Sequence, residues 1–176
     1  INKSIGLEDS TVAPLTDVQM GIWLADHISS QRNTFTIAHK VHITGNLDSK
    51  YLLEAIQLGL KEADTVQAVY REYNGVPTQQ LDRSDLEFTP AWMDISNQSD
   101  GQAYMDSLIQ QDLDAELTLS STMPLVRQIV FKVSDQQYVW YQRFHHIMLD
   151  GFSFNAFTAR VASIYQALVL QKTITN

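Results

Sequence analysis

The segment YQRFHHIMLDGFSF, residues 141–154, closes an aromatic run with two adjacent histidines and an Asp-Gly pair. If the run is a β-strand, successive side chains alternate between two faces, so His145 and His146 point to opposite sides of a sheet. One imidazole should then be structural and the other available for chemistry. Gly151 permits a tight turn into a following helix. The segment therefore predicts a strand, a turn and a helix, with His146 at a sheet edge, where clefts commonly form.

Three interpretations of the histidines compete. In the first, both are ordinary core or surface groups, since histidine is moderately buried in many domains. In the second, His146 and Asp150 bind a metal. A zinc site needs three or four ligands, however, and the other spaced pair, His39 and His42, lies on opposite faces of its strand, so no metal site is predicted. In the third, a neutral imidazole held by Asp150 or by backbone serves as a general base.

Hydrophobic periodicity predicts helices and strands over most of the remaining chain. Val18, Ile22 and Ala25 recur at helical spacing and predict a first helix with these residues on its apolar stripe. Asn74-Gly75 is the strongest turn signal and predicts a hairpin. The other predicted elements are a strand over 34–45, a helix from 49 to 63, the two strands of the hairpin within 65–81, a strand over 86–95 that Pro90 confines to an edge, a helix from 100 to 113, strands over 125–133 and 138–146, and a helix over 154–168.

The order of these elements predicts the fold class. Helix, strand, helix, hairpin, strand, helix, hairpin and helix do not form the regular βαβ alternation of a doubly wound sheet. We expect an α/β fold of the α+β sandwich type, with a mixed, largely antiparallel sheet and helices packed on it. Residues 1–14 are polar up to Pro14 and predict a lead-in segment, which leaves 15–176 as one domain.

Composition excludes several classes of function. A net charge of −8 with scattered basic residues argues against a nucleic-acid binder, which needs clustered Lys and Arg to neutralise phosphates. The chain has no cysteine, which excludes disulfides, thiol catalysis and thiolate metal sites. No apolar stretch approaches the roughly 20 residues of a membrane helix. We expect a soluble, cytoplasmic protein that binds neither membrane nor nucleic acid.

HHIMLDG, residues 145–151, resembles the core motif of the condensation domains of nonribosomal peptide synthetases, within the chloramphenicol acetyltransferase-like superfamily of acyltransferases. LTDVQMGIW, residues 15–23, resembles the family's opening motif and matches it at Gln19 and Trp23. The resemblance extends over residues 14–170 and is greatest to catechol siderophore synthetases. It implies a chloramphenicol acetyltransferase-like lobe.

The resemblance also implies roles for the motif residues. His146 corresponds to the catalytic residue, which takes or steers a proton as an amine attacks a thioester. His145 is implied to be structural. Asp150 corresponds to a structural aspartate that pairs with an arginine in the family. Gly151 corresponds to a glycine whose small size leaves room for a pantetheine arm, and whose N–H can face the developing oxyanion.

The chain departs from the family pattern at the arginines. Gly21 stands where the opening motif has arginine, and Gln67 stands where the next motif has its second arginine. The usual partner of Asp150 is therefore in doubt. Arg143 is a candidate replacement, although strand alternation places it on the same face as His145.

A full condensation domain has two such lobes, and this chain resembles only the N-terminal one. We therefore expect the catalytic histidine without turnover by the isolated chain. The resemblance implies amide formation between a donor, 2,3-dihydroxybenzoyl thioester, and a seryl acceptor. The lobe itself would bind no cofactor, because aryl and peptidyl carrier proteins deliver phosphopantetheine. The other implied partners are the second lobe and a downstream adenylation domain.

Other functions remain open. A CoA-dependent acyltransferase of the same fold and a non-catalytic lobe that only binds carrier proteins are the main alternatives. The altered arginine positions favour the non-catalytic lobe, whereas the intact histidine motif counts against it. Epimerization domains share the histidine motif as well.

Overall fold

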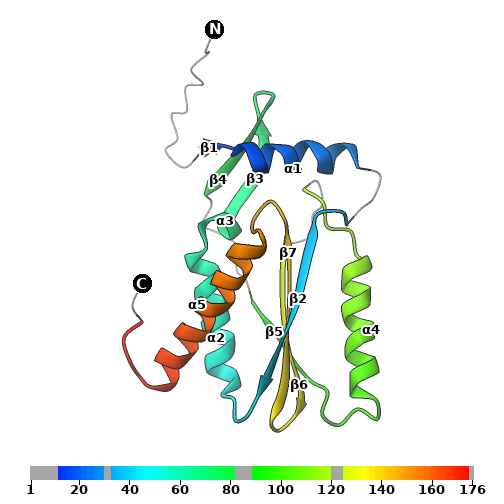
Figure 1. Ribbon diagram of the computed structural model, residues 1–176, viewed down its shortest axis with the longest axis vertical. Coiled ribbons are helices and arrows are strands. Elements are labelled where there is room, and N and C mark those ends of the chain that lie inside the picture. Colours follow the sequence, from blue (N-terminus) through cyan, green and yellow to red (C-terminus); the bar gives the residue numbers. More distant parts are fainter. Residues whose placement is uncertain (1–11, 30–32, 82–88, 120–124, 175–176) are drawn as a thin grey trace.

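The main sheet has four strands and lies at the centre of the molecule (Figure 1). Its order is β2 (Thr36–Thr44), β7 (Gln137–His145), β6 (Val126–Ser134) and β5 (Ala91–Asp94). The first two pairings are antiparallel and the last is parallel, so the sheet is mixed and largely antiparallel, as predicted. The computed structural model describes residues 12–29, 33–81, 89–119 and 125–174.

A second sheet of three strands contains the predicted hairpin. Its order is β1 (Val12–Pro14), β4 (Val76–Leu81) and β3 (Ala68–Tyr73). Asn74 and Gly75 join β3 to β4 with φ of 51° and 79°, which is the left-handed pair that a tight hairpin turn requires. The hairpin prediction is confirmed. The last three residues of the expected lead-in form β1, while residues 1–11 lie outside the described part of the chain.

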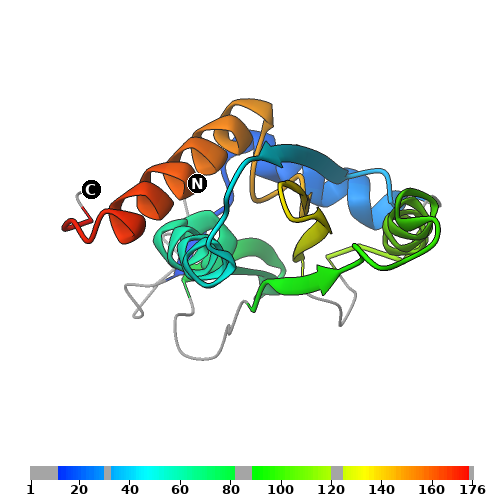
Figure 2. The same ribbon diagram turned by 90° about the horizontal axis from the view of Figure 1, so that it is seen from below.

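Helices cover both faces of the main sheet. The helices α2 (Ser49–Glu62) and α5 (Gly151–Val169) pack on one face, and α4 (Gly101–Asp114) lies on the other (Figure 2). The long helix α1 (Asp17–Ile28) crosses the end of the sheet, and the short α3 (Asp64–Gln67) precedes β3. Two helix layers around a sheet agree with the predicted sandwich.

The central strand β7 divides its side chains between the two cores. Trp140 and Phe144 belong to the larger buried cluster, which includes residues of α2 and α5. Val139 and Tyr141 belong to a second cluster with residues of α4. This separation follows from the two-residue period of a strand and confirms the predicted alternation.

A close contact joins α2 to α5. A Cβ atom added to Gly59 would lie 2.7 Å from Cγ2 of Val161, nearer than two carbon atoms can approach without a shift. The absence of a side chain at position 59 therefore allows the two helices to pack closely.

The predicted apolar stripe of α1 is wrong at Val18, whereas Ile22 packs against the larger core as predicted. Val18 is 73% exposed, and the helix instead buries Gln19 and Trp23. The reason is that α1 lies across the end of the sheet, where peptide groups of loops need partners, so part of its inner face is polar. Thr16 caps the helix and forms a capping box with Gln19.

Candidate active site

The turn that follows β7 carries the motif to the end of the main sheet, beneath α1 (Figure 1). The strand ends at His145, and the N–H of His146 donates to the carbonyl of Phe35 at 2.7 Å. The N–H of Met148 donates to the carbonyl of His145 at 3.0 Å, which closes a tight turn. These two hydrogen bonds thus fix the backbone at His146 and across the turn that contains it.

His145 is fully buried, and both of its ring nitrogens have partners. Its Nδ1 accepts from the N–H of Ile147 at 3.2 Å, so the ring proton is on Nε2. The Nε2 lies 3.4 Å from Oδ1 of Asp26 on α1. Burial lowers the pKa of His145, and the nearby Asp26 carboxylate only partly opposes this effect. His145 is therefore neutral near pH 7.

Acidification is expected to destabilise the chain through His145. Its folded-state pKa is lowered, so below the unfolded pKa of about 6.5 the unfolded chain binds a proton that the folded chain does not. The free energy of unfolding should fall by up to about 1.4 kcal/mol per pH unit until the pH reaches the folded-state pKa. Urea unfolding at a series of pH values from 7 downward measures this slope. His145→Gln should flatten it, and an unchanged slope in that variant would contradict the assignment.

His146 is half-buried and differs from its neighbour in its ring contacts. Among the described residues its Nδ1 is buried without a hydrogen-bond partner. Because Nδ1 is buried, any proton exchange with a bound molecule has to use Nε2, whereas both ring nitrogens of His145 have protein partners. The two histidines thus differ in burial and in the contacts of their rings.

Asp150 caps the helix that follows the turn. Its carboxylate is exposed and accepts from the N–H of Ser153 at 2.7 Å, so α5 begins at Gly151, three residues before the predicted start. Hydrogen bonds from the backbone and side chain of Ser153 lower the pKa of Asp150, and the electrostatic effect of His146 adds a smaller contribution in the same direction. Nothing lies within 4 Å of a Cβ added to Gly151, so the space beside it is open.

The suggested pairing of Arg143 with Asp150 is not found. Arg143 is buried on the α4 side of β7, and its Nε lies 3.2 Å from Oδ2 of Asp112. Its Nη1 also donates to the carbonyl of Asp112 at the C-terminal end of α4, where a cation is favourable. Sequence reasoning missed Asp112, because nothing in the spacing of residues indicates which helix covers Arg143.

The other two departures from the motif have separate surroundings. Gly21 is exposed on α1, with nothing within 4 Å of an added Cβ. Gln67 is buried and donates to the carbonyls of Leu60 and Lys61 at the end of α2. Neither contact involves Asp150, whose carboxylate serves as a helix cap in this chain.

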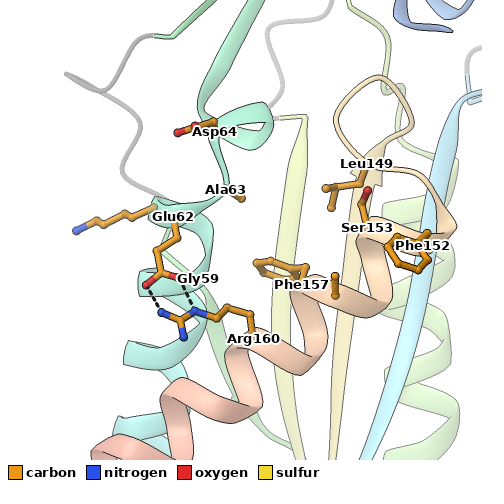
Figure 3. Close-up of a pocket in the computed structure, with 11 residues that line it drawn as sticks. Gly59, Glu62, Ala63, Asp64, Leu149, Phe152, Ser153, Phe157 and Arg160 are labelled. Carbon is orange, nitrogen blue, oxygen red and sulfur yellow. Dashed lines mark hydrogen bonds and ion pairs between the residues drawn. The ribbon is translucent and has the colours of Figure 1, made fainter. Parts of the chain in front are cut away.

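A groove of about 730 Å³ opens between the motif and the C-terminal end of α2 (Figure 3). Leu149, Phe152 and Phe157 provide apolar surface on the motif side. On the other side, Glu62 and Arg160 form an ion pair with distances of 2.6 and 2.8 Å, drawn as dashed lines in Figure 3. The groove therefore offers an apolar wall and a charged rim next to the residues that follow His146.

Neither a metal-binding cluster nor a membrane-spanning helix occurs in the described ranges. No group of three or more His, Cys, Asp and Glu side chains there has the arrangement of a metal site. His39 packs edge-on against Phe154, with ring centroids 4.7 Å apart. In the same part of the chain, no helix has both the length and the apolar character needed to cross a membrane.

Comparison with known proteins identifies relatives among peptide synthetases. Enterobactin synthase component F of Escherichia coli is 38% identical over 152 residues, which are 86% of this chain and 12% of that protein. Vanchrobactin synthetase of Vibrio anguillarum is 30% identical over 158 residues, or 87% of this chain and 6% of that protein. The chain thus matches only a small part of each relative.

Solved structures agree in fold. The starter condensation domain of rhizomide synthetase superposes with a TM-score of 0.85 at 28% identity, over 95% of this chain and 40% of that one. The first condensation domain of the CDA synthetase superposes with a TM-score of 0.84 at 21% identity, over 96% and 43% of the two chains. The family profile of the condensation domain matches residues 9–176. The chain therefore belongs to the condensation-domain family of nonribosomal peptide synthetases.

Proposed function

We propose that this chain is the N-terminal lobe of a condensation domain that forms an amide between two carrier-bound substrates. The observation that carries the proposal is the state of His146. It lies directly after β7 and is half-buried, with a buried Nδ1 that has no partner among the described residues, so Nε2 is the nitrogen proposed to act. Open space among the described residues lies beside Gly151, five residues further along the motif.

His146 would act on the attacking amine. The α-ammonium of the acceptor must lose a proton before its nitrogen can attack, and a neutral imidazole can take or steer that proton near pH 7. The nitrogen then bonds to the thioester carbon and loses a second proton as the C–S bond breaks. One of the two protons passes to the departing thiolate and the other is released to solvent. Gly151 is the first residue of α5, so its N–H lies at the positive end of the helix, where an oxyanion is stabilised.

The relatives support a proposal for the substrates. Similarity to enterobactin synthase component F and vanchrobactin synthetase supports a siderophore pathway. We infer a 2,3-dihydroxybenzoyl thioester as donor and a seryl thioester as acceptor, carried by aryl and peptidyl carrier proteins on phosphopantetheine arms. The second condensation lobe and an adenylation domain would be the partners in the parent protein, and His145 would support the motif without touching substrate.

A donor on free CoA is the second candidate. The starter condensation domain of rhizomide synthetase has been solved in complex with C8-CoA, and it covers 95% of this chain. The two donors are distinguished by offering the complete domain the same acyl group on CoA and on a carrier protein. Faster transfer from the carrier supports the carrier-bound donor.

The isolated chain is expected not to turn over. Solved condensation domains are more than twice as long as the part that this chain matches, so residues from a second lobe would complete the active site. The measurement is mass spectrometry of amide product from aryl and seryl carrier thioesters, with the isolated chain and the complete domain in parallel. Product from the isolated chain above a His146→Ala control would overturn this expectation. No product from the complete domain would overturn the proposed function.

A further inference from the structure

We propose that helix α1 positions His146, and that Gln19 and Asp26 are the positioning residues. Both side chains act on the peptide groups of Ile147, the residue next to His146. We call the contacts of Gln19 and Asp26 with the turn after β7, those of Asp26 passing through His145, the clamp. That His146 reacts with substrate rests on the proposed function, whereas the clamp rests on these contacts alone. Sequence reasoning named Gln19 only as a motif match and did not identify Asp26.

Gln19 holds the carbonyl side of Ile147. Its Nε2 donates to the carbonyl oxygen of Ile147 and to Oε1 of Gln79, each at 3.3 Å. Its Oε1 accepts from the N–H of Thr16 at 3.0 Å, so both the nitrogen and the oxygen of the side-chain amide are hydrogen-bonded. The side chain is buried, which makes loss of any of these bonds costly.

Asp26 holds the N–H side of Ile147 through His145. Its Oδ1 lies 3.4 Å from Nε2 of His145, and its Oδ2 accepts from the N–H of Leu119 at 3.0 Å. The carboxylate is only 8% exposed. Because Asp26 fixes the proton of His145 on Nε2, Nδ1 stays free to accept from Ile147 at 3.2 Å. The Asp26 carboxylate thereby sets the tautomer of His145 that accepts the hydrogen bond from Ile147 in the turn.

The spacing of the clamp is helical. Gln19, Trp23 and Asp26 are separated by four and three residues, so they form one face of α1. Trp23 is buried between the two polar residues and stacks on His27, with ring centroids 4.4 Å apart. His146 has no such partner on Nδ1 within the described residues, so the direction of its ring depends on the turn.

Gln19→Glu tests the carbonyl side of the clamp. A glutamate can still accept from Thr16 and keep the capping box, but it cannot donate to Ile147. We expect the amide of Ile147 to exchange hydrogen about tenfold faster, and carbethoxylation of His146 to rise about threefold relative to His39, which is exposed. Thr16→Ala is the matched control, because it breaks the cap without touching the turn.

Asp26→Asn tests the other side. Whichever way its amide is turned, one N–H, of either Leu119 or His145, loses its acceptor. We expect shifted ring ¹⁵N resonances for His145 and His146, whereas Asp17→Asn on the exposed side of α1 should leave both unchanged. Wild-type exchange, reactivity and ring resonances in both Gln19→Glu and Asp26→Asn would overturn the inference.

Kinetics separate the clamp from the proposed function. In the complete domain, both variants should lower kcat with little change in KM, because they alter the direction of the His146 ring and not groups proposed to bind substrate. If the wild-type domain forms no amide while the exchange and resonance changes are observed, the proposed function fails and the clamp stands. If the domain is active and the turn is unaffected by either variant, the clamp fails alone.

Discussion

His146→Ala in the complete condensation domain is expected to lower kcat by about 10²- to 10⁴-fold, the usual contribution of a positioned general base. The reason lies in the different surroundings of the two histidines. His145 uses both ring nitrogens in contacts with Asp26 and Ile147, whereas Nδ1 of His146 is buried without a partner, which leaves its Nε2 to meet an incoming amine. The measurement is the single-turnover rate of amide formation from saturating carrier thioesters.

A lower rate in His146→Ala must be distinguished from a loss of folded structure in that variant. His42→Ala is the matched control, because His42 is exposed on β2 and the change removes the same imidazole. It should keep the wild-type rate, and both variants should keep the wild-type unfolding midpoint. If His146→Ala retains more than about a tenth of the wild-type rate, the residue is not a general base of ordinary strength.

Arg143→Met is expected to destabilise the folded chain by about 3 kcal/mol, because it leaves a buried carboxylate without its closest cation. Asp112 is only 8% exposed, and Arg143 is 1% exposed. Methionine fills much of the same volume, so the loss reflects charge and hydrogen bonds more than packing. Urea unfolding followed by circular dichroism measures the change.

Arg127 offers a matched control for the same carboxylate. Its Nε lies 3.3 Å from Oδ1 of Asp112, but its side chain is 48% exposed. Water screens this pair, so Arg127→Met should cost less than about 1 kcal/mol. Adding Asp112→Leu to Arg143→Met should recover part of the loss, because no buried charge then remains. Equal effects of the two arginine variants would contradict the importance of burial.

Much of the fold could be predicted because local patterns and tertiary contacts agree. The alternation in β7 divided Trp140 and Phe144 from Val139 and Tyr141, and the structure places these pairs in separate cores. Asn74-Gly75 marked a turn whose geometry few other residues adopt. Such features depend on near neighbours in the sequence, which a single chain records directly.

The features that were missed depend on distant residues. The partner of Arg143 is 31 positions away on α4, and the partner of His145 is 119 positions away on α1. The inner face of α1 was misassigned because hydrophobic spacing favoured Val18, whereas the peptide groups of the turn require the polar Gln19. Asp150 was the exception, since its spacing from Ser153 is a local capping signal that was overlooked.

The tight packing of α2 on α5 has a consequence for protein engineering. Gly59 lines the groove beside the motif, but any larger residue there meets Val161 before it reaches the groove. Substitutions meant to reshape the groove should therefore leave position 59 unchanged. Ala156 and Phe152 are the better starting points for a library, because both line the groove and are exposed, so their replacement leaves the helix pair in register.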